Sequence, residues 1–217
     1  GHDVIGQAKT GTGKTLGFAL PLLERLVAPN DPVHPDHEAP AAPQALVVVP
    51  TRELAMQVAN EVRHASKTRG ARVLTVYGGR SYEPQVEALE AGVDVVVGTP
   101  GRLLDLVEKR HLHLGDIKTL VLDEADEMLD MGFLPDIERI VALTPNDRHT
   151  MLFSATMAGE VAGFARACLV DPVKIEIVKS GTMAAKAEQK VYLVPQQSKT
   201  DLLLSLLAED DATTLVF

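Results

Sequence analysis

Short apolar runs recur along the chain and alternate with longer stretches in which apolar residues lie three or four positions apart. The runs are rich in β-branched residues, and several have no polar face, which is typical of central strands in a parallel sheet. They predict strands at residues 3–6, 45–50, 72–79, 93–100, 119–126, 150–156 and 173–177. Strands buried on both faces require helices on both sides of the sheet.

The stretches between these strands have helix-forming composition and amphipathic spacing. They predict helices at residues 13–27, 52–67, 83–91, 101–109, 134–143 and 158–167. Because strands and helices alternate, we expect an α/β fold with right-handed crossovers and a doubly wound, mostly parallel sheet with helices on both faces. Ligands of such sheets bind at the carboxyl ends of the strands, and the unusual motifs of this chain fall just after predicted strands.

A proline-rich segment interrupts this alternation. Residues 29–43 contain five prolines in fifteen positions, which predicts an exposed loop. His34 and His37 in this loop invite a metal-site interpretation. No further ligands are placed to close such a site, so we favour a loop without a metal.

The C-terminal part has a different organisation. Residues 179–189 predict a polar linker that separates a domain at 1–178 from the start of a second domain at 190–217. The pattern of that second part predicts a strand, a helix and a further strand, at residues 190–194, 198–209 and 213–217. One unit of this size does not bury its own apolar faces, so we expect the rest of the second domain to be missing.

Composition narrows the class of protein. The chain has 217 residues, enough for one α/β domain that buries about 70% of its unfolded surface. Its single cysteine, Cys168, rules out an internal disulfide and is typical of a buried thiol in a reducing cytosol, so we expect a cytoplasmic protein. The pattern of these residues predicts neither a membrane span nor a secretory signal. The net charge of −9 argues against a broadly basic nucleic-acid surface but is compatible with a local basic patch.

The stretch GQAKTGTGKT at residues 6–15 lies between a predicted strand and a predicted helix and nearly matches a phosphate-binding loop. Backbone N–H groups at the start of a helix converge on phosphate oxygens. We expect Lys14 to reach the β- and γ-phosphates of a nucleotide and the Thr15 hydroxyl to bind magnesium. Ala8 replaces the first glycine of the pattern, and its methyl group fits if φ stays negative. The candidate nucleotide-binding residues are Ala8, Thr10, Gly11, Thr12, Gly13, Lys14 and Thr15.

The stretch LVLDEAD at residues 120–126 places acidic residues at the end of a buried strand. Asp123 can hold magnesium through its water ligands, and Glu124 can orient and polarise an attacking water. Carboxylates also favour helix starts for electrostatic reasons alone. Their combination with the phosphate loop favours a hydrolytic site in which Lys14, Asp123 and Glu124 are the candidate catalytic residues.

The motifs AKTGTGKT, PTREL, GG, TPGR, DEAD and SAT occur here in the order and spacing of the DEAD-box ATP-dependent RNA helicases. The resemblance covers residues 1–178. The phosphate loop of that family normally begins with alanine, which accounts for Ala8. The resemblance implies a RecA-like P-loop NTPase domain, with ATP and Mg²⁺ as cofactors and RNA as the partner.

The resemblance also implies an RNA-binding track at the strand ends. PTREL at 50–54 and TPGR at 99–102 each follow a strand and begin a helix, so backbone N–H groups and hydroxyls can contact phosphates there without reading sequence. The two adjacent glycines allow close approach of the RNA backbone. Helix capping by Thr51 or Thr99 is the simpler alternative for either motif alone. The candidate RNA-binding residues are Pro50, Thr51, Arg52, Gly78, Gly79, Thr99, Pro100, Gly101 and Arg102.

In the same family, the hydroxyls of SAT interact with the DEAD carboxylates and link the ATP state to strand separation. Ser154 and Thr156 are therefore expected to have this coupling role together with Asp126. No base for a nucleophile lies near Ser154 in the sequence, so we do not expect it to be catalytic.

Two family features are not found in these residues: the upstream glutamine segment that recognises adenine, and the arginines of the second domain. An absent arginine finger lowers the rate by about 10³ to 10⁵, so we expect the chain alone to be nearly inactive. The leading hypothesis is the core domain of an RNA helicase. The alternatives are an ATP-gated scaffold that clamps RNA with little turnover, and a DNA helicase of the same superfamily.

Overall fold

The computed structural model describes residues 2–8, 12–27, 42–157, 159–176, 190–208, 213–214 and 216. The chain divides into two compact units, Gly1–Ser180 and Gly181–Phe217. The predicted linker and most of the predicted proline-rich loop, including His34 and His37, lie outside the described residues.

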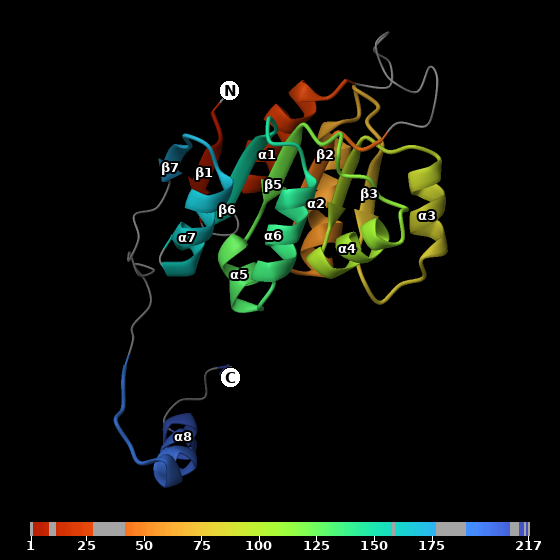
Figure 1. Ribbon diagram of the computed structural model, residues 1–217. Coiled ribbons are helices and arrows are strands. Elements are labelled where there is room, and N and C mark those ends of the chain that lie inside the picture. The colour runs from red at the N-terminus through yellow and green to blue at the C-terminus, as the bar shows by residue number, and fades with distance from the viewer. Residues whose placement is uncertain are drawn as a thin grey trace. The chain divides into compact units, whose positions relative to one another are not determined.

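The first unit is built on one sheet of seven parallel strands in the order β3-β4-β2-β5-β6-β1-β7 (Figure 1). The strands are β1 Val4–Gln7, β2 Ala45–Val48, β3 Val73–Val76, β4 Val95–Gly98, β5 Thr119–Leu122, β6 His149–Ser154 and β7 Val173–Glu176. Every strand predicted within residues 1–178 is present, although most are shorter than the run that predicted them. The sheet is all parallel, and the predicted doubly wound α/β fold is confirmed.

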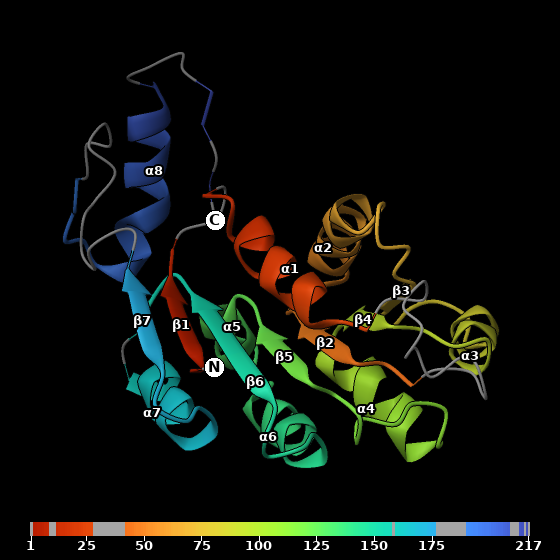
Figure 2. The same cartoon turned by 90° about the horizontal axis from the view of Figure 1, so that it is seen from above.

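Helices cover both faces of this sheet, as predicted (Figure 2). One layer consists of α1 and α2, and the opposite layer contains α4, α5, α6 and α7, while α3 packs beside the edge strand β3. The helices are α1 Lys14–Arg25, α2 Arg52–Ala65, α3 Glu83–Glu90, α4 Pro100–Glu108, α5 Ala125–Asp130, α6 Leu134–Leu143 and α7 Gly159–Cys168. No helix in the described part of the chain is long and apolar enough to cross a membrane.

The two faces have separate cores that the strands supply alternately. In β2, Leu46 and Val48 pack with the core under α4 to α7, whereas Ala45 and Val47 pack with the core under α1 and α2. All four side chains are fully buried. This burial on both faces explains why the run has no polar position.

The helix α5 was not predicted. It has only six residues, and three of them are acidic, so the sequence shows no clear apolar period there. The apolar pair Met128 and Leu129 packs into the core. The predicted helix at 101–109 begins one residue earlier, at Pro100, which occupies a position where a missing N–H costs nothing.

The second unit contains a short 3₁₀ turn at Gln196–Ser198 and the helix α8 at Lys199–Ala208. The bounds of α8 differ by one residue at each end from those of the helix predicted at 198–209. The predicted strand at 190–194 is wrong, because these residues have no regular structure. Val191 and Leu193 are 87% and 96% exposed. A strand needs a neighbour for its backbone groups, and none pairs with this run among the described residues.

Because all strands of the first unit run the same way, their carboxyl ends meet at one edge of the sheet. The predicted motifs follow β1, β2, β3, β4, β5 and β6 at that edge. The fold therefore gathers segments that are far apart in the sequence.

Candidate active site and nucleic-acid interface

The start of the phosphate loop is tied to the end of a neighbouring strand. The Ala8 amide donates a hydrogen bond to the carbonyl oxygen of Ser154 at 3.1 Å. Ala8 is buried and is not one of the residues with positive φ, which is the condition predicted for its methyl group. Gly13, just before α1, has a φ of 83°, a left-handed value that favours glycine. Thr10 and Gly11 lie outside the described residues.

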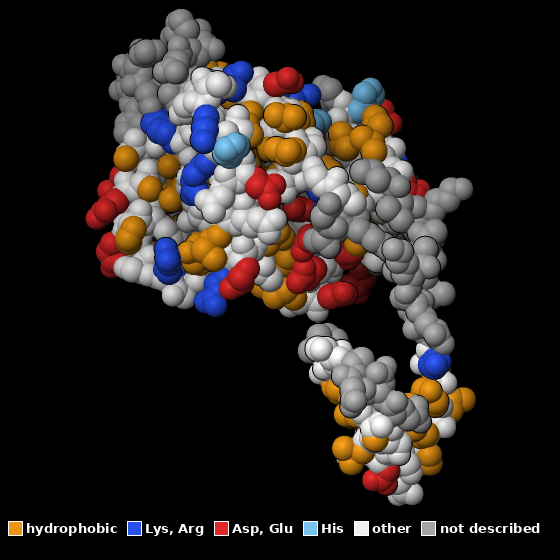
Figure 3. All heavy atoms as spheres, turned by 180° about the vertical axis from the view of Figure 1, so that it is seen from behind, with side chains coloured by type: hydrophobic (Ala, Val, Ile, Leu, Met, Phe, Trp, Pro, Cys, Tyr) orange, Lys and Arg blue, Asp and Glu red, His pale blue; other side chains and the backbone are white. Residues whose placement is uncertain are grey.

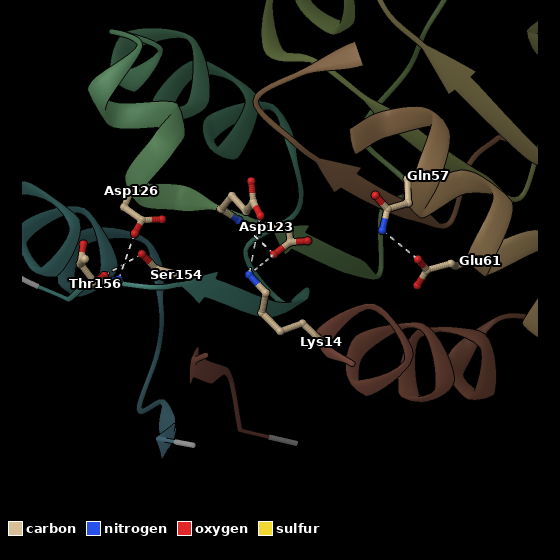
Figure 4. Close-up of polar contacts among 8 residues, drawn as sticks. Lys14, Gln57, Glu61, Asp123, Asp126, Ser154 and Thr156 are labelled. Carbon is tan, nitrogen blue, oxygen red and sulfur yellow. Dashed lines mark hydrogen bonds and ion pairs between the residues drawn. The ribbon is translucent and has the colours of Figure 1, made fainter. Parts of the chain in front are cut away.

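Lys14 is the first residue of α1, and its side chain extends toward the end of β5 (Figure 4). Its Nζ lies 3.5 Å from Oδ1 of Asp123 and 4.0 Å from Oε1 of Glu124. The Lys14 and Asp123 side chains are only 7% and 4% exposed, so their charges attract through a medium of low dielectric constant. The fold thus brings together the three candidate catalytic residues, with Thr15 next in the same helix and Thr12 exposed before it.

Burial changes the acidity of both carboxyl groups. It raises the pKa of Asp123, while the Lys14 ammonium acts in the opposite direction. It also raises the pKa of Glu124 to about 7, and a hydrogen bond with Glu127 adds to this rise. A group with a pKa near 7 changes its protonation state close to neutral pH, as acid–base catalysis requires.

The backbone at Glu124 adopts a left-handed conformation, with φ of 54°. This conformation is costly for a residue with a side chain and is concentrated at functional sites. The Glu124 amide donates a hydrogen bond to Oδ1 of Asp123 at 3.0 Å, which holds the turn between β5 and α5. The Asp123 carboxylate therefore has a fixed position relative to the Glu124 backbone.

A cavity of about 380 Å³ opens beside these groups. Its walls include Lys14, Glu124 and Ala155. They also include Glu127 and Asp130 of α5, which the sequence reasoning did not single out. Their spacing of three positions on one helix is the signal that indicates a shared face.

The SAT turn contacts the DEAD segment through its backbone (Figure 4). The Thr156 amide donates a hydrogen bond to Oδ2 of Asp126 at 2.9 Å. The Ser154 hydroxyl donates to the Thr156 carbonyl oxygen at 2.6 Å. The expected contact between these segments is present, but it differs in kind, because an amide rather than a hydroxyl makes it.

The two threonines of the predicted RNA track differ. Thr51 precedes α2, and its hydroxyl accepts a hydrogen bond from the Leu54 amide at 3.3 Å, which caps the helix. Thr99 precedes α4, and within the described residues its side chain makes no capping hydrogen bond. Capping thus accounts for Thr51 and leaves Thr99 without a structural role of that kind.

The glycines of the track are exposed at the edge. A Cβ atom built at Gly78, Gly79 or Gly101 meets no atom within 4 Å in the described structure. Gly79 has a φ of 77°, whereas Gly78 is not among the residues with positive φ. The backbone at this turn is therefore open to a ligand.

The two arginines of the track have different surroundings. Arg52 is exposed, and its Nε donates to Glu53 at 2.5 Å. The Arg102 side chain is only 9% exposed, lies 4.1 Å over the Tyr82 ring and donates to the Arg80 carbonyl oxygen at 3.0 Å. Pro50, two residues before α2, and Pro100, the first residue of α4, are both buried. Arg52 is thus accessible to a ligand, and Arg102 holds the turn that follows β3.

A protein-family model described as DEAD/DEAH box helicase matches residues 1–164. A crystal structure of a DEAD box protein from Methanococcus jannaschii is similar, with a TM-score of 0.73, 36% identity and coverage of 95% of this chain and 53% of that one. A crystal structure of a hypothetical ATP-dependent RNA helicase from Sulfolobus tokodaii has a TM-score of 0.70 and 38% identity, and covers 81% of this chain and 48% of that one.

Curated proteins from bacteria are also similar. The DEAD-box ATP-dependent RNA helicase CshA of Streptococcus pneumoniae is 45% identical over 95% of this chain and 38% of its own length. The RNA helicase CrhR of Synechocystis is 42% identical over 100% of this chain and 42% of its own length. The ATP-dependent RNA helicase RhlB of Pseudomonas aeruginosa is 40% identical over 97% of this chain and 53% of its own length. The chain thus spans between 38% and 53% of these relatives.

Proposed function

The chain belongs to the DEAD/DEAH box helicase family, and from this premise we propose that it is the first RecA-like domain of an ATP-dependent RNA helicase. The observation that carries the proposal is the cluster of Lys14, Asp123 and Glu124 at the same sheet edge as the exposed glycine turn at 78–79. A nucleotide site and a backbone-binding track on one edge suit an enzyme that couples hydrolysis to RNA binding.

The residues present fit magnesium. Asp123 supplies a buried carboxylate and Thr15 supplies a hydroxyl, and Mg²⁺ prefers oxygen ligands. The ion commonly keeps several waters and uses one or two carboxylates together with substrate phosphates. Such a site is compatible with the finding that the described residues contain no cluster of three or more His, Cys, Asp or Glu side chains suited to a metal. When bound, Mg²⁺ neutralises charge that develops on the phosphates.

The site residues have distinct proposed roles in hydrolysis. Lys14 binds the β- and γ-phosphates, which compete with Asp123 and Glu124 for its ammonium group. Glu124 orients the attacking water through its carboxylate. The hydrogen bond between its amide and Asp123 holds the Glu124 backbone in place. The loop residues Ala8, Thr10, Gly11, Thr12 and Gly13 direct backbone N–H groups toward the phosphates.

The link from ATP to RNA runs through the SAT turn in this proposal. Asp126 lies two residues after Glu124 and accepts the Thr156 amide, while Ser154 at the end of β6 also accepts the Ala8 amide. The phosphate loop, the DEAD segment and the SAT turn thus form one hydrogen-bonded chain. A shift of the phosphate loop on nucleotide binding would displace Thr156 through these hydrogen bonds.

RNA is proposed to lie along the ends of β2, β3 and β4. Arg52 and the hydroxyls of Thr51 and Thr99 meet phosphates, and the exposed backbone at the glycine turn approaches the sugars. The remaining track residues act through backbone position, and Arg102 orders the turn after β3. The residues of the proposed track, whether they contact RNA or position it, are Pro50, Thr51, Arg52, Gly78, Gly79, Thr99, Pro100, Gly101 and Arg102.

A second RecA-like domain is proposed to follow residues 1–178 and a linker at 179–189, and to begin at 190–217. It would supply the arginines that stabilise charge on the γ-phosphate. The three relatives named above carry RNA helicase in their descriptions. These descriptions favour RNA over DNA as the partner and a helicase over a scaffold.

The test measures ATP turnover by the complete two-domain protein with single-stranded RNA or DNA of identical sequence. RNA should stimulate turnover and DNA should not. Glu124→Gln should retain ATP and RNA binding and lose turnover by at least about 10²-fold, while Glu138→Gln on the exposed face of α6 should match the wild type. Normal turnover by Glu124→Gln, or equal stimulation by DNA, contradicts the proposal.

A further inference from the structure

A second and larger cavity, of about 570 Å³, lies beside the edge strand β3. It is lined by residues of α2, of β3, of the segment between β3 and α3, and of the start of α3. Tyr77 and Arg80 in its wall flank the Gly78–Gly79 turn on either side. None of its lining residues belongs to the motifs that define the proposed RNA track, so the cavity has no assigned role.

The cavity carries positive charge. Its lining includes Arg63 and Arg80 and contains no Asp or Glu. Within the described residues, neither guanidinium group has an ion-pair partner, and both side chains belong to exposed residues. Figure 3, which shows the face covered by α1 and α2, has Lys and Arg side chains gathered toward the β3 side of the molecule. An anionic ligand is therefore favoured.

Arg63 is held in place by neutral acceptors. Its Nε and Nη2 donate to the Val73 carbonyl oxygen at 3.2 and 3.1 Å, Nη2 donates to Thr75 at 2.8 Å, and Nη1 donates to Asn60 at 2.9 Å. These bonds orient the group without neutralising its charge. A fixed guanidinium loses less entropy when it binds a phosphate than a mobile one does.

Another part of the lining is apolar and aromatic. The Tyr77 hydroxyl lies 3.5 Å from the sulfur of Met56, which is 39% exposed, and the Arg80 guanidinium lies 5.6 Å from the centre of the Tyr77 ring. Gln85 in the wall is 7% exposed, and its Oε1 has no hydrogen-bond partner among the described residues. Apolar surface for a base and cations for a phosphate match the chemistry of one nucleotide.

A peptide strand fits this place less well. An added strand would need the free edge of β3. Arg63 already occupies that edge through the Val73 carbonyl oxygen, as edge strands are often protected. The cavity lining also contains two arginines and no carboxylate, which a phosphate chain matches directly.

We propose that this cavity is an RNA subsite, which holds one single-stranded nucleotide beyond the segment bound at the Gly78–Gly79 turn. Arg80 and Arg63 bind its phosphate, and its base packs against Met56 and the edge of Tyr77. The inference rests on the proposed function, because it extends the RNA track past the end of β3.

The test uses the complete chain and fluorescently labelled single-stranded RNA, with affinity measured by anisotropy over a range of salt concentrations. Arg80→Gln should weaken binding about threefold to tenfold and flatten the salt dependence by about 0.7 in log–log slope, the value for one phosphate of a single strand. The matched control is Arg139→Gln on α6, whose side chain is also exposed and pairs with Glu108. It should match the wild type in both respects.

A second measurement locates the base. RNA that carries 4-thiouridine should crosslink on irradiation to the peptides that contain Met56 or Tyr77, and Arg80→Gln should reduce this crosslink. The subsite is overturned if Arg80→Gln has the affinity and crosslinking of the wild type while Gly78→Ala still weakens RNA binding. In that case the proposed function stands. Absence of RNA binding by the wild type and all variants overturns both. Binding of a poly-glutamate peptide that Arg80→Gln abolishes, with RNA binding unchanged, overturns the subsite in favour of an acidic protein ligand.

Discussion

The Nζ of Lys14 and Oδ1 of Asp123 lie 3.5 Å apart, and both side chains are almost completely buried. Removal of one partner of a buried pair leaves the other charge without compensation. Lys14→Met should therefore destabilise the protein without nucleotide by about 2 kcal/mol. Thermal unfolding should show a midpoint lower by about 4–8 °C.

A double-mutant cycle separates this pairing from lost packing. Asp123→Asn removes the acceptor charge, so the Lys14→Met change should cost less in that background. The coupling energy should be about 1–2 kcal/mol, as found for residues in direct contact. Additive effects of the two substitutions would show that the buried charges do not stabilise each other.

The acidity of Glu124 predicts a pH-dependent effect on stability. Its pKa is about 7 in the folded protein and near 4.5 in the unfolded chain, so the folded state becomes less stable as pH rises through this interval. Glu124→Gln has no charge to bury. It should raise the unfolding midpoint by about 2–4 °C at pH 8 and change it little at pH 5.

Glu138→Gln is the control for this measurement, because Glu138 is exposed on α6. It should leave the unfolding midpoint unchanged at both pH values. An equal rise for Glu124→Gln at pH 5 and pH 8 would show that burial of the charge is not the cause.

The alternation of apolar and amphipathic runs was sufficient to predict the strands and the α/β class. The order of the strands was not predictable, because a run such as Leu46–Val48 records burial on both faces and not the identity of its neighbours. Local pattern also failed at 190–194, where apolar residues have no partner among the described residues. The six residues of α5 are too few for a helical period to stand out.

Within the candidate site, the residues that belong to recognisable motifs were predictable from the sequence. The residues that pack beside those motifs in space were not. Lys14 and Asp123 belong to short patterns with a chemical meaning. Arg63 and Tyr77 come from a helix and an adjacent strand end, and only the packing of α2 beside β3 brings them to one cavity. Contacts that depend on tertiary packing leave no local signature in a single sequence.

The thiol of Cys168 should react slowly in the native protein. Burial raises its pKa to about 12, compared with 9.0 for an unperturbed thiol. The thiolate is the reactive form, and its fraction at pH 8 should be about 10⁻⁴ in the folded state and about 10⁻¹ in the unfolded state. Labelling with a thiol reagent should be about a thousand times faster in denaturant than in buffer, and comparable rates would contradict the burial.

Substitutions of the two threonines of the track distinguish a role in helix capping from a role in RNA binding. Thr51→Ala removes the hydroxyl that caps α2, so it should cost about 1 kcal/mol of stability. Thr99→Ala removes no capping hydrogen bond among the described residues, and it should cost less than about 0.5 kcal/mol. Both should weaken RNA binding if the track is correct. Unchanged RNA affinity in Thr99→Ala would remove that residue from the track.

Substitutions at the two adjacent glycines distinguish the effect of backbone strain from the effect of RNA contact. Gly79 has a φ of 77°, so Gly79→Ala should destabilise the protein by about 1 kcal/mol. Gly78 has ordinary φ and open space around a Cβ position, so Gly78→Ala should leave the unfolding midpoint within about 1 °C of the wild type. Any loss of RNA affinity in Gly78→Ala then reports contact and not unfolding.

The added methyl group of Gly78→Ala should hold the RNA backbone away and weaken binding about threefold to tenfold in an anisotropy titration. Gly163→Ala is the control, because Gly163 lies inside α7, far from the track in the sheet order, with open space around its Cβ position. Alanine favours a helix interior over glycine, so this variant should be more stable by about 0.5–1 kcal/mol and bind RNA like the wild type. If Gly78→Ala binds RNA as tightly as Gly163→Ala does, the backbone at the end of β3 does not contact RNA.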